Sequence, residues 1–317
     1  GLAFFYFSNL PQYVQGGDSG EMVLAAYRLL VAHPPGYPLW IWLEHFFTHL
    51  IPLGSVFWRA SLLSSLFSLS ALLCIFSSTN RSPWSVLSVC ILALATPFIE
   101  AALIPDVFSF HALLIVVIGS VYLFSVKDSR LFHFGIPFLF SLSLAHHLTT
   151  VFLFPVVCDV AIECRKEKKI FFSFLLSAFV GVCFALGLYW SMVAFHPNSS
   201  LSWGIVDSPA AILRHFLRSD YGTFRLSARE NTGTLAGVIF FLRSSWIEIC
   251  AFAALFLTAF LTNPKALRDK KILVWGGGCI ASIGFFLMAN VNPVGMGEEV
   301  LRRFCLMPLV QLTLLAA

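Results

Sequence analysis

IFFSFLLSAFVGVCFALGLYWSMVA, residues 170–194, is an unbroken apolar run that contains no Asp, Glu, Lys or Arg. Two further runs of this kind cover Ala60 to Ser78 and Val107 to Ser125. A helix needs about 20 apolar residues to cross the hydrocarbon core of a bilayer. In lipid, an open chain must be helical because its backbone groups have no water to bond. These runs therefore predict transmembrane helices.

The composition of the whole chain supports a membrane protein. Of its 317 residues, 58% are hydrophobic and only 11% are charged, and the mean hydropathy is +0.85. A soluble domain usually has about 25% charged residues. We therefore expect residues 1–317 to form one all-α, polytopic transmembrane helical bundle. The spans are predicted near residues 60–78, 84–102, 107–125, 132–145, 147–161, 170–194, 244–262 and 272–289.

The lysines indicate which loops face the cytosol. They occur in three short loops, at positions 127, 166, 168, 169, 265, 270 and 271. Because cytosolic loops carry an excess of Lys and Arg, the loops 10–58, 196–243 and 290–303 are expected on the lumenal or periplasmic side. This topology leaves Leu39 to Leu53 as a helix that lies in the interface and does not cross.

Both ends of the chain and its cysteines give further expectations. The chain opens on GLAFFYFSNL, too short for a span, and stops inside an apolar run. We therefore expect a fragment truncated at both ends. The eight cysteines form no C-x-x-C pair and no cluster with histidines. Neither disulfides nor a thiolate metal site is predicted.

An acidic motif follows the opening apolar segment. Gly16-Gly17-Asp18-Ser19-Gly20-Glu21 has the spacing of a capping box, with Asp18 three residues before Glu21. The alternative is that Asp18, flanked by glycines that allow a substrate to approach, is a general base. Both interpretations are compatible.

The run GGDSGEMVLAAYRLLVAHPPGYPLW, residues 16–40, closely resembles the signature of a glycosyltransferase family. That family includes the eukaryotic transmembrane O-mannosyltransferase acting on IPT domains of plexins and related receptors. It also has bacterial relatives. The resemblance continues through residues 57–59, 104–108, 144–149, 203–222 and 299–304. It implies the GT-C fold of enzymes that use polyprenyl-phosphate sugars.

The resemblance also implies a set of site residues. Asp18 is the expected base, Glu21 a supporting acceptor or cap, and Asp106 a second acid. Asp106 stands where the family pattern has Glu, so its reach is shorter. Arg302 and Arg303 are expected to hold the donor phosphate, unless they only snorkel to lipid headgroups. The other expected substrate-binding residues are His33, Tyr37, Arg59, His146, His147, Arg218 and Tyr221, and no metal ligands are expected.

The implied activity is inverting transfer of mannose from a dolichyl or polyprenyl phosphate to Ser and Thr hydroxyls of lumenal protein domains. The expected partners are the lipid-linked donor, a protein acceptor and membrane lipids, with no nucleic acid. No cofactor is required by this chemistry, and a divalent metal requirement is left open. The expected location is the endoplasmic reticulum membrane, or the plasma or inner membrane in a bacterium. The alternatives are a GT-C transferase that modifies a lipid or glycan, and a transporter or flippase.

Overall fold

Helices form all the regular structure that the computed structural model describes, which covers the chain except residues 128, 196–199, 224, 228–234 and 266–267. The helices are α1 (Leu2–Ser8), α2 (Ser19–Arg28), α3 (Pro38–Leu50), α4 (Val56–Ser78), α5 (Pro83–Leu94), α6 (Thr96–Leu103), α7 (Val107–Phe124), α8 (Ile136–Ser143), α9 (Phe154–Cys164), α10 (Lys168–Ser191), α11 (Pro209–Phe216), α12 (Ala236–Ser244), α13 (Trp246–Thr262), α14 (Lys270–Gly284), α15 (Met296–Phe304) and α16 (Leu306–Ala316). Short helical turns are η1 (Leu131–Gly135), η2 (Leu148–Leu153), η3 (Met192–Ala194) and η5 (Phe285–Leu287). The prediction of an all-α bundle is confirmed.

Four helical segments are long and apolar enough to span a bilayer in the described part of the chain. They are Val56–Ser78, Val107–Phe124, Lys168–Ala194 and Lys270–Leu287, and each matches a predicted span. Two bent helix pairs, α5 with α6 and α12 with α13, would raise the number to six if each pair is one span. The membrane character expected from composition is thus supported.

The predicted single span at 84–102 is wrong in one respect, because the chain bends by 64° between α5 and α6. Ala95 is extended at the break, and α6 carries Pro97 in its first turn. Proline lacks the N–H that a continuing helix needs, so α5 cannot run through Pro97, and a new helix begins just before it. Pro97 marks the break in the sequence. A prediction from mean hydropathy alone does not detect it, because the residues on both sides are apolar.

The predicted spans at 132–145 and 147–161 are shorter than the bilayer core. The apolar segment Leu131–Ser143 has 13 residues, and such a helix extends only about 20 Å against a core of about 30 Å. The chain turns at His146 and His147 before η2 and α9 begin. The chain therefore reverses direction at these histidines, as expected. Neither the segment before them (η1 and α8) nor the segment after them (η2 and α9) is a full-length span.

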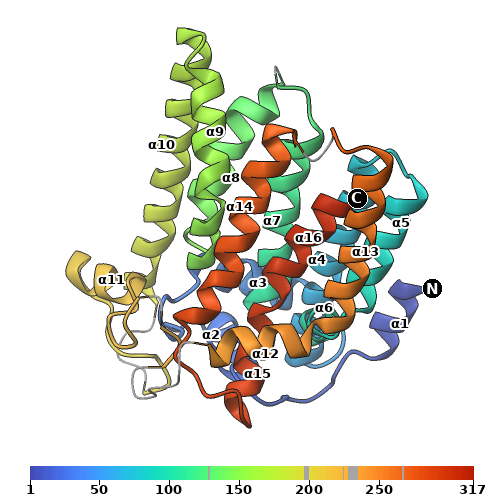
Figure 1. Ribbon diagram of the computed structural model, residues 1–317. Coiled ribbons are helices and arrows are strands. Elements are labelled where there is room, and N and C mark those ends of the chain that lie inside the picture. Colours follow the sequence, from blue (N-terminus) through green and yellow to red (C-terminus); the bar gives the residue numbers. More distant parts are fainter. Residues whose placement is uncertain (128, 196–199, 224, 228–234, 266–267) are drawn as a thin grey trace.

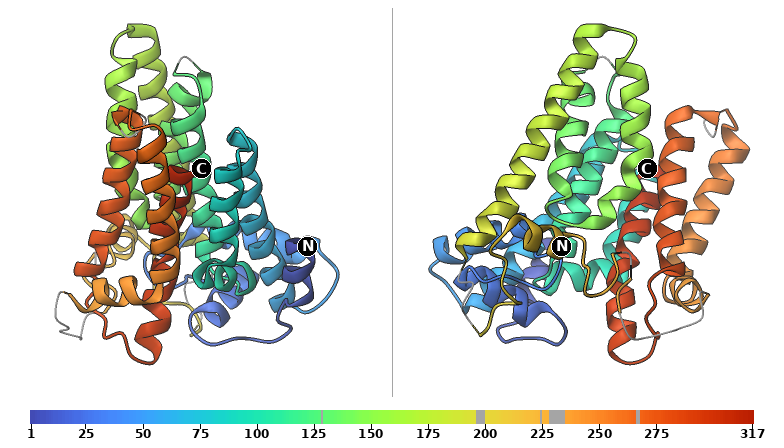
Figure 2. Two further views of the ribbon diagram at one scale, coloured as in Figure 1. Left: turned by 45° about the vertical axis from the view of Figure 1, so that its right-hand side comes forward. Right: turned by 90° about the vertical axis from the view of Figure 1, so that its left-hand side faces the viewer.

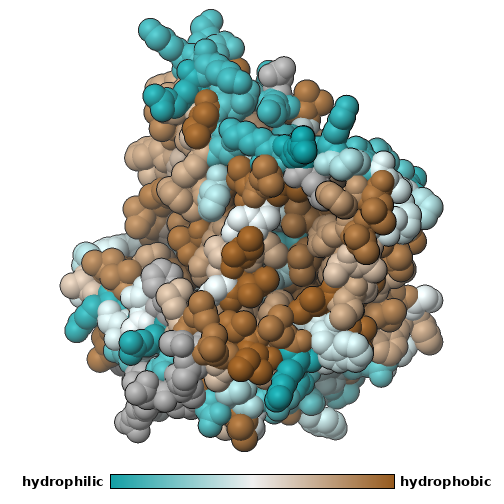
Figure 3. Space-filling view, in the orientation of Figure 1, coloured by the Kyte–Doolittle hydropathy of each residue, from teal (hydrophilic) through white to brown (hydrophobic). Residues whose placement is uncertain are grey.

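The lysine loops and the polar loops lie at opposite ends of the bundle. The turns that join α7 to α8, α9 to α10 and α13 to α14 are at the upper end in Figure 1, and α2, α11, α12 and α15 are at the lower end. Figure 3 shows hydrophilic side chains gathered at the upper end, above a hydrophobic middle zone. Lys270 pairs with Asp159, and Lys271 Nζ donates to the Ser125 carbonyl at 3.1 Å. This arrangement is the one that the predicted topology requires.

The assignment of the lower end to the lumen stays a prediction, which glycosylation tests. Asn198-Ser199-Ser200 is a sequon on the expected lumenal side, although Asn198 itself lies outside the described residues. Asn80-Arg81-Ser82 is a sequon in the turn between α4 and α5. We expect a glycan at Asn198 and none at Asn80 when the protein is made in a eukaryotic cell, as read by glycosidase shift of each Asn→Gln variant. A glycan on Asn80 would reverse the topology.

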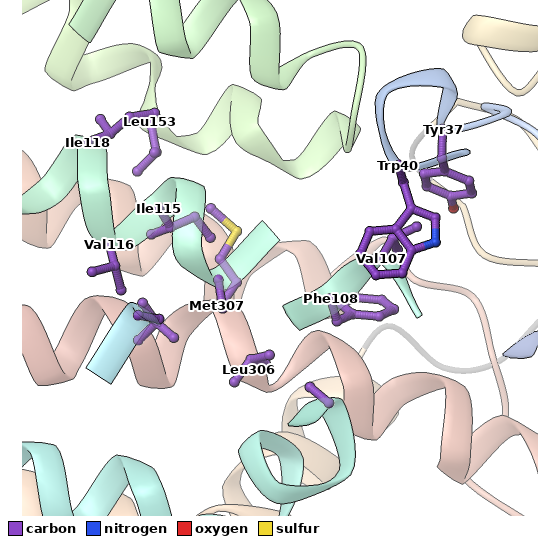
Figure 4. Close-up of a cluster of buried hydrophobic side chains, with 14 of the residues drawn as sticks. Tyr37, Trp40, Val107, Phe108, Ile115, Val116, Ile118, Leu153, Leu306 and Met307 are labelled. Atoms are coloured by element: carbon purple, nitrogen blue, oxygen red, sulfur yellow. The ribbon is translucent and has the colours of Figure 1, made fainter. Parts of the chain in front are cut away.

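The interior is continuous from the middle of the bundle to its lower end. Figure 4 shows Tyr37 and Trp40 lying beside Val107 and Phe108, at the start of α7. Farther along α7, a side chain at Gly119 would collide with Trp275 and Leu314, at 2.5 and 2.6 Å. A small residue therefore lets α7, α14 and α16 approach closely, as is common between membrane helices. This packing fixes the start of α7 relative to the loops below it.

Helix α3 has 13 residues, too few to span, and packs against α2 and α4. Its Glu44 is completely buried, and neither carboxylate oxygen has a hydrogen-bond partner. Burial raises the pKa of Glu44 to about 8, because a charged group is penalised in a medium of low polarity. Glu44 is therefore protonated at neutral pH.

Glu44→Gln is expected to flatten the pH dependence of stability. The raised pKa of folded Glu44 favours folding at low pH, and this contribution is lost as pH rises from about 4.5 towards 8. At pH 7 the loss amounts to roughly 3 kcal/mol, at about 1.4 kcal/mol for each pH unit. Melting temperatures in detergent between pH 5 and 8 measure it. An unchanged slope in Glu44→Gln would show that Glu44 does not titrate in this range.

Candidate active site

Two acids from distant parts of the chain meet at one arginine. Arg303 Nη1 donates to Asp18 Oδ2 and to Asp106 Oδ2, each at 2.9 Å. These partners are separated from Arg303 by 285 and 197 residues in sequence. Arg303 and Asp106 are largely buried, whereas the side chain of Asp18 is 45% exposed. The site thus has an inner and an outer carboxylate joined by a guanidinium.

Each member of this trio is placed by the end of a helix. Asp18 directly precedes α2, Asp106 precedes α7, and Arg303 lies in the last turn of α15. Asp106 Oδ1 accepts a 2.6 Å hydrogen bond from the Val107 N–H, so Asp106 caps α7. Burial raises the pKa of Asp106, while the adjacent Arg303 acts to lower it. Asp106 is therefore held in one orientation by both of its oxygens.

The capping-box interpretation of the acidic motif is wrong. The Asp18 side chain caps no N–H of α2 and pairs with Arg303 instead. Glu21 Oε1 accepts a 2.6 Å bond from the His33 N–H, and Glu21 Oε2 lies 3.2 Å from His33 Nδ1. Both acidic side chains are thus turned away from the helix start and towards residues of the site. This geometry leaves the general-base interpretation of Asp18 in place.

Gly17 allows Arg303 to approach. Its φ of +72° is in the left-handed region, and a Cβ at this position would lie 2.0 Å from Arg303 Nη2. Glycine is the residue that adopts this backbone region without steric cost. The glycine beside Asp18 therefore serves both the turn and the close contact with the guanidinium.

His33 and the prolines after it form one wall of the site. The turn contains a cis Pro34–Pro35 bond and leads into α3. Tyr37 Oη lies 3.5 Å from His33 Nε2, and the His33 ring also contacts the edge of Trp203. The backbone N–H of Trp203 donates a 2.8 Å hydrogen bond to the Val31 carbonyl, which positions Trp203. Trp203 belongs to residues 203–222, one of the segments that carry the family resemblance.

The histidine pair is buried beside this wall. His146 Nε2 is 2.9 Å from the Val107 carbonyl, and His147 Nδ1 is 2.7 Å from Thr149 Oγ1. The His147 ring stacks on Tyr37 with centroids 5.9 Å apart. His146 therefore hydrogen-bonds to the first turn of α7, and His147 packs against Tyr37 at the edge of the site. Their contact with substrate stays a prediction.

A cavity of about 180 Å³ lies among these groups and brings most of the predicted residues together. Its walls include residues from both ends of the sequence, namely Asp18, Glu21, His33, Tyr37, Asp106, Val107, Phe108, Trp203, Arg218, Tyr221, Leu226, Val300, Arg303 and Phe304. Ligand sites are typically concave, with a few convergent polar groups. This cavity fits that description and is the candidate active site.

Arg302 and Arg59, by contrast, do not line the cavity. Arg302 Nη1 pairs with Glu100 and Nη2 with Glu298, both at 2.7 Å, so it joins α15 to α6. Arg59 Nη1 donates to the Ile51 carbonyl at 3.0 Å and to the Thr48 carbonyl. Glu100 is a partner that sequence reasoning missed, since it lies 202 residues from Arg302. Substrate binding by Arg302 and Arg59 stays a prediction.

Arg59→Ala is expected to lower stability without changing substrate affinity. Removing the guanidinium leaves carbonyls at the end of α3 unpaired, which costs about 1–3 kcal/mol. The melting temperature should fall by several degrees, while the KM for the donor stays within about twofold. An unchanged melting temperature with a raised donor KM would instead support the predicted substrate role of Arg59.

Comparisons with known proteins confirm the predicted resemblance. Residues 18–171 match the family model described as the protein O-mannosyl-transferase TMEM260 N-terminal domain. The chain is 28% identical to the mouse protein O-mannosyl-transferase TMEM260, over 96% of this chain and 46% of that protein. It is 25% identical to the Dictyostelium discoideum protein O-mannosyl-transferase tmem260, over 69% of this chain and 30% of that protein. The chain thus spans less than half the length of these relatives.

The fold is that of a solved GT-C structure. ArnT from Cupriavidus metallidurans in the apo state matches 99% of this chain and 57% of its own, with a TM-score of 0.65 and 12% identity. The same protein bound to undecaprenyl phosphate matches 99% of this chain and 58% of its own, with a TM-score of 0.66 and 14% identity. The GT-C-like architecture expected from the sequence is confirmed.

Proposed function

We propose that this chain is the membrane domain of a glycosyltransferase that moves mannose from a dolichyl or polyprenyl phosphate to Ser and Thr hydroxyls of a lumenal protein domain. The observation that carries the proposal is the meeting of Asp18 and Asp106 at Arg303, in a cavity at the end opposite the lysine loops. The names of the relatives support the sugar and the protein acceptor. The undecaprenyl phosphate bound to ArnT supports a lipid-linked donor.

The proposed reaction needs one base and one leaving group. The acceptor oxygen attacks C1 of mannose, the bond from C1 to the phosphate oxygen breaks, and the polyprenyl phosphate leaves with the bonding electrons. Asp18 takes the proton of the attacking hydroxyl. Its Oδ2 is engaged by Arg303, while its Oδ1 has no hydrogen-bond partner among the described residues. Attack from the face opposite the phosphate inverts the anomeric carbon.

The remaining site groups orient the reactants in this proposal. Asp106 is buried, and its two oxygens accept hydrogen bonds from the Val107 N–H and from Arg303. It is therefore suited to position Arg303 and a sugar hydroxyl more than to exchange protons. Glu21 fixes His33, whose ring borders the same cavity as Tyr37 and Trp203. Fixed polar groups of this kind contribute to catalysis by holding reacting atoms in a productive geometry. The proposed location is the endoplasmic reticulum membrane, or the plasma or inner membrane of a bacterium.

The acceptor assay tests this proposal. The purified protein is incubated with radiolabelled dolichyl phosphate mannose and, in parallel, with a folded IPT domain, a lipid acceptor and a free glycan. We expect label on Ser or Thr of the protein domain, located by mass spectrometry of its peptides. Label on the lipid or glycan alone would replace the proposal by the alternative transferase. Transfer to no acceptor, under conditions in which the donor binds, would remove the enzymatic assignment.

A further inference from the structure

The segment from Ser202 to Val206 is tied to the wall of the acidic cavity, the cavity of about 180 Å³ that contains the two acids of the site. The Trp203 backbone N–H donates to the Val31 carbonyl at 2.8 Å, and the Val31 N–H donates to Ser202 Oγ at 3.2 Å. At the other end of the segment, Val206 is buried in the core. The position of the segment relative to the site is therefore fixed from both ends.

Two large apolar side chains of this segment remain exposed. Trp203 is 44% exposed and Ile205 is 61% exposed. Between them, Gly204 has a φ of +74°, and nothing lies within 4 Å of a Cβ at its position. A glycine of this kind turns the chain and also lets another backbone approach closely. Residues 203–205 thus form an accessible apolar surface, which we call the apolar strip.

The apolar strip borders the side of the cavity on which the candidate base lies. Trp203 lines the cavity together with Asp18, and its ring meets the His33 ring edge-on, with centroids 6.0 Å apart. His33 is bound in turn by Glu21, in the first turn of α2 directly after Asp18. Asp18 is the more exposed of the two acids. An acceptor hydroxyl that approaches Asp18 from outside therefore brings its neighbouring residues close to Trp203.

Fixed apolar side chains beside a cavity are suited to bind a protein segment. Tryptophan is enriched among the residues that dominate binding energies at protein interfaces, and a surface that is already ordered loses less conformational freedom on binding. Tyr221, whose ring centroid lies 5.0 Å from Arg218 Cζ, adds a second aromatic wall to the cavity. Tryptophans also anchor membrane proteins at the headgroup level, but the contact with His33 places Trp203 in the wall of the cavity.

We propose that the apolar strip binds the protein acceptor, by packing against an apolar side chain next to the Ser or Thr that receives the sugar. This inference rests on the proposed function, in which the acceptor is a lumenal protein domain. Trp203 then sets the register in which the acceptor chain passes Asp18, and so selects which hydroxyl is presented. Ile205 extends the contact along the same chain. The strip takes part in acceptor selection and not in bond making.

Acceptor kinetics test the inference. The probe is a folded IPT domain, offered with saturating dolichyl phosphate mannose to the purified wild-type protein and to Trp203→Ala, Ile205→Ala and Trp246→Ala. Trp246 is the matched control, since it is also an exposed tryptophan and begins α13 outside the cavity. We expect Trp203→Ala to raise the KM for the IPT domain about 10- to 100-fold. Ile205→Ala should raise it by less, and Trp246→Ala should leave it unchanged.

A reciprocal change in the acceptor shows whether the contact is direct. Apolar residues on either side of the modified Ser or Thr of the IPT domain are replaced by Asp. This replacement should raise the KM of the wild-type protein about 10-fold and that of Trp203→Ala very little, because the contact is already lost in that variant. Trp203→Phe, which keeps an aromatic ring, should recover most of the lost affinity. Ile205→Asp, which places a charge on the strip and leaves the cavity wall intact, replaces Trp203→Ala if that variant fails to fold.

Two results would overturn the inference and leave the proposed function standing. One is a wild-type KM for the IPT domain in folded Trp203→Ala or Ile205→Asp. The other is a raised KM for the donor with an unchanged KM for the IPT domain, which would place the Trp203 ring against the sugar.

Binding without donor separates the inference from the proposed function, because it requires no turnover. The IPT domain is titrated onto immobilised wild-type protein and onto Trp203→Ala in the absence of any mannose donor. Binding that depends on Trp203, in a protein that transfers no mannose, would contradict the proposed activity and leave the docking strip in place. Neither binding nor transfer with the IPT domain would overturn both.

Discussion

Asp18→Asn is expected to lower kcat by about 100- to 10,000-fold, the usual contribution of a general base. The amide oxygen of Asn can still accept the hydrogen bond that Arg303 Nη1 gives to Asp18 Oδ2, so the local structure should survive. The amide cannot accept the proton of the acceptor hydroxyl. Steady-state transfer from dolichyl phosphate mannose, together with the melting temperature of each protein, measures both consequences.

The control for this substitution is Asp207→Asn, which changes an exposed acid outside the cavity. It should leave kcat and the melting temperature as in the wild type. Near-normal turnover by a well-folded Asp18→Asn protein would reduce Asp18 to an ion-pair partner of Arg303, and the base would then have to be sought elsewhere in the cavity.

Gly17→Ala is expected to lower kcat by roughly 100-fold, since a shift of about 1 Å in a catalytic group can cost that much. The new methyl group would lie 2.0 Å from Arg303 Nη2, so the guanidinium that joins Asp18 to Asp106 must move. The φ of +72° adds strain for any side chain. The measurement is kcat with saturating donor and acceptor.

Gly16→Ala is the matched control because nothing lies within 4 Å of a Cβ at that position, and its backbone is not left-handed. We expect its kcat to stay within about twofold of the wild type. If Gly16→Ala and Gly17→Ala lost activity equally, the effect would come from general stiffening of the loop, and the contact of Gly17 with Arg303 would not explain it.

The positions of the long helices can be predicted from the sequence where an apolar run is long enough to span a bilayer. The run at 170–194 and the run at 107–125 are both single long helices, because a charge-free stretch of that length has one stable form in lipid. The bend between α5 and α6 was missed although Pro97 marks it, since apolar composition continues through the break. Local backbone chemistry, more than hydropathy, shapes such spans.

The site was predictable in its acids and less so in its cations. Asp18 and Asp106 were singled out by motif, and the structure brings them to one guanidinium. The sequence could not reveal that Arg302 is neutralised by Glu100, because ion pairs between distant segments depend on how α6 and α15 pack. Figure 2 shows how the segments from the two ends of the chain come together at the lower end of the bundle. Which arginines remain unpaired is a property of the fold.

The donor specificity of the purified protein tests the central claim most directly. Radiolabelled mannose is offered either as dolichyl phosphate mannose or as GDP-mannose, with the same protein acceptor and no added membranes. The account predicts label on the acceptor from the lipid donor alone, and its loss in Asp18→Asn. Transfer from GDP-mannose in the absence of any lipid carrier would contradict the lipid-linked chemistry and the site assigned to it.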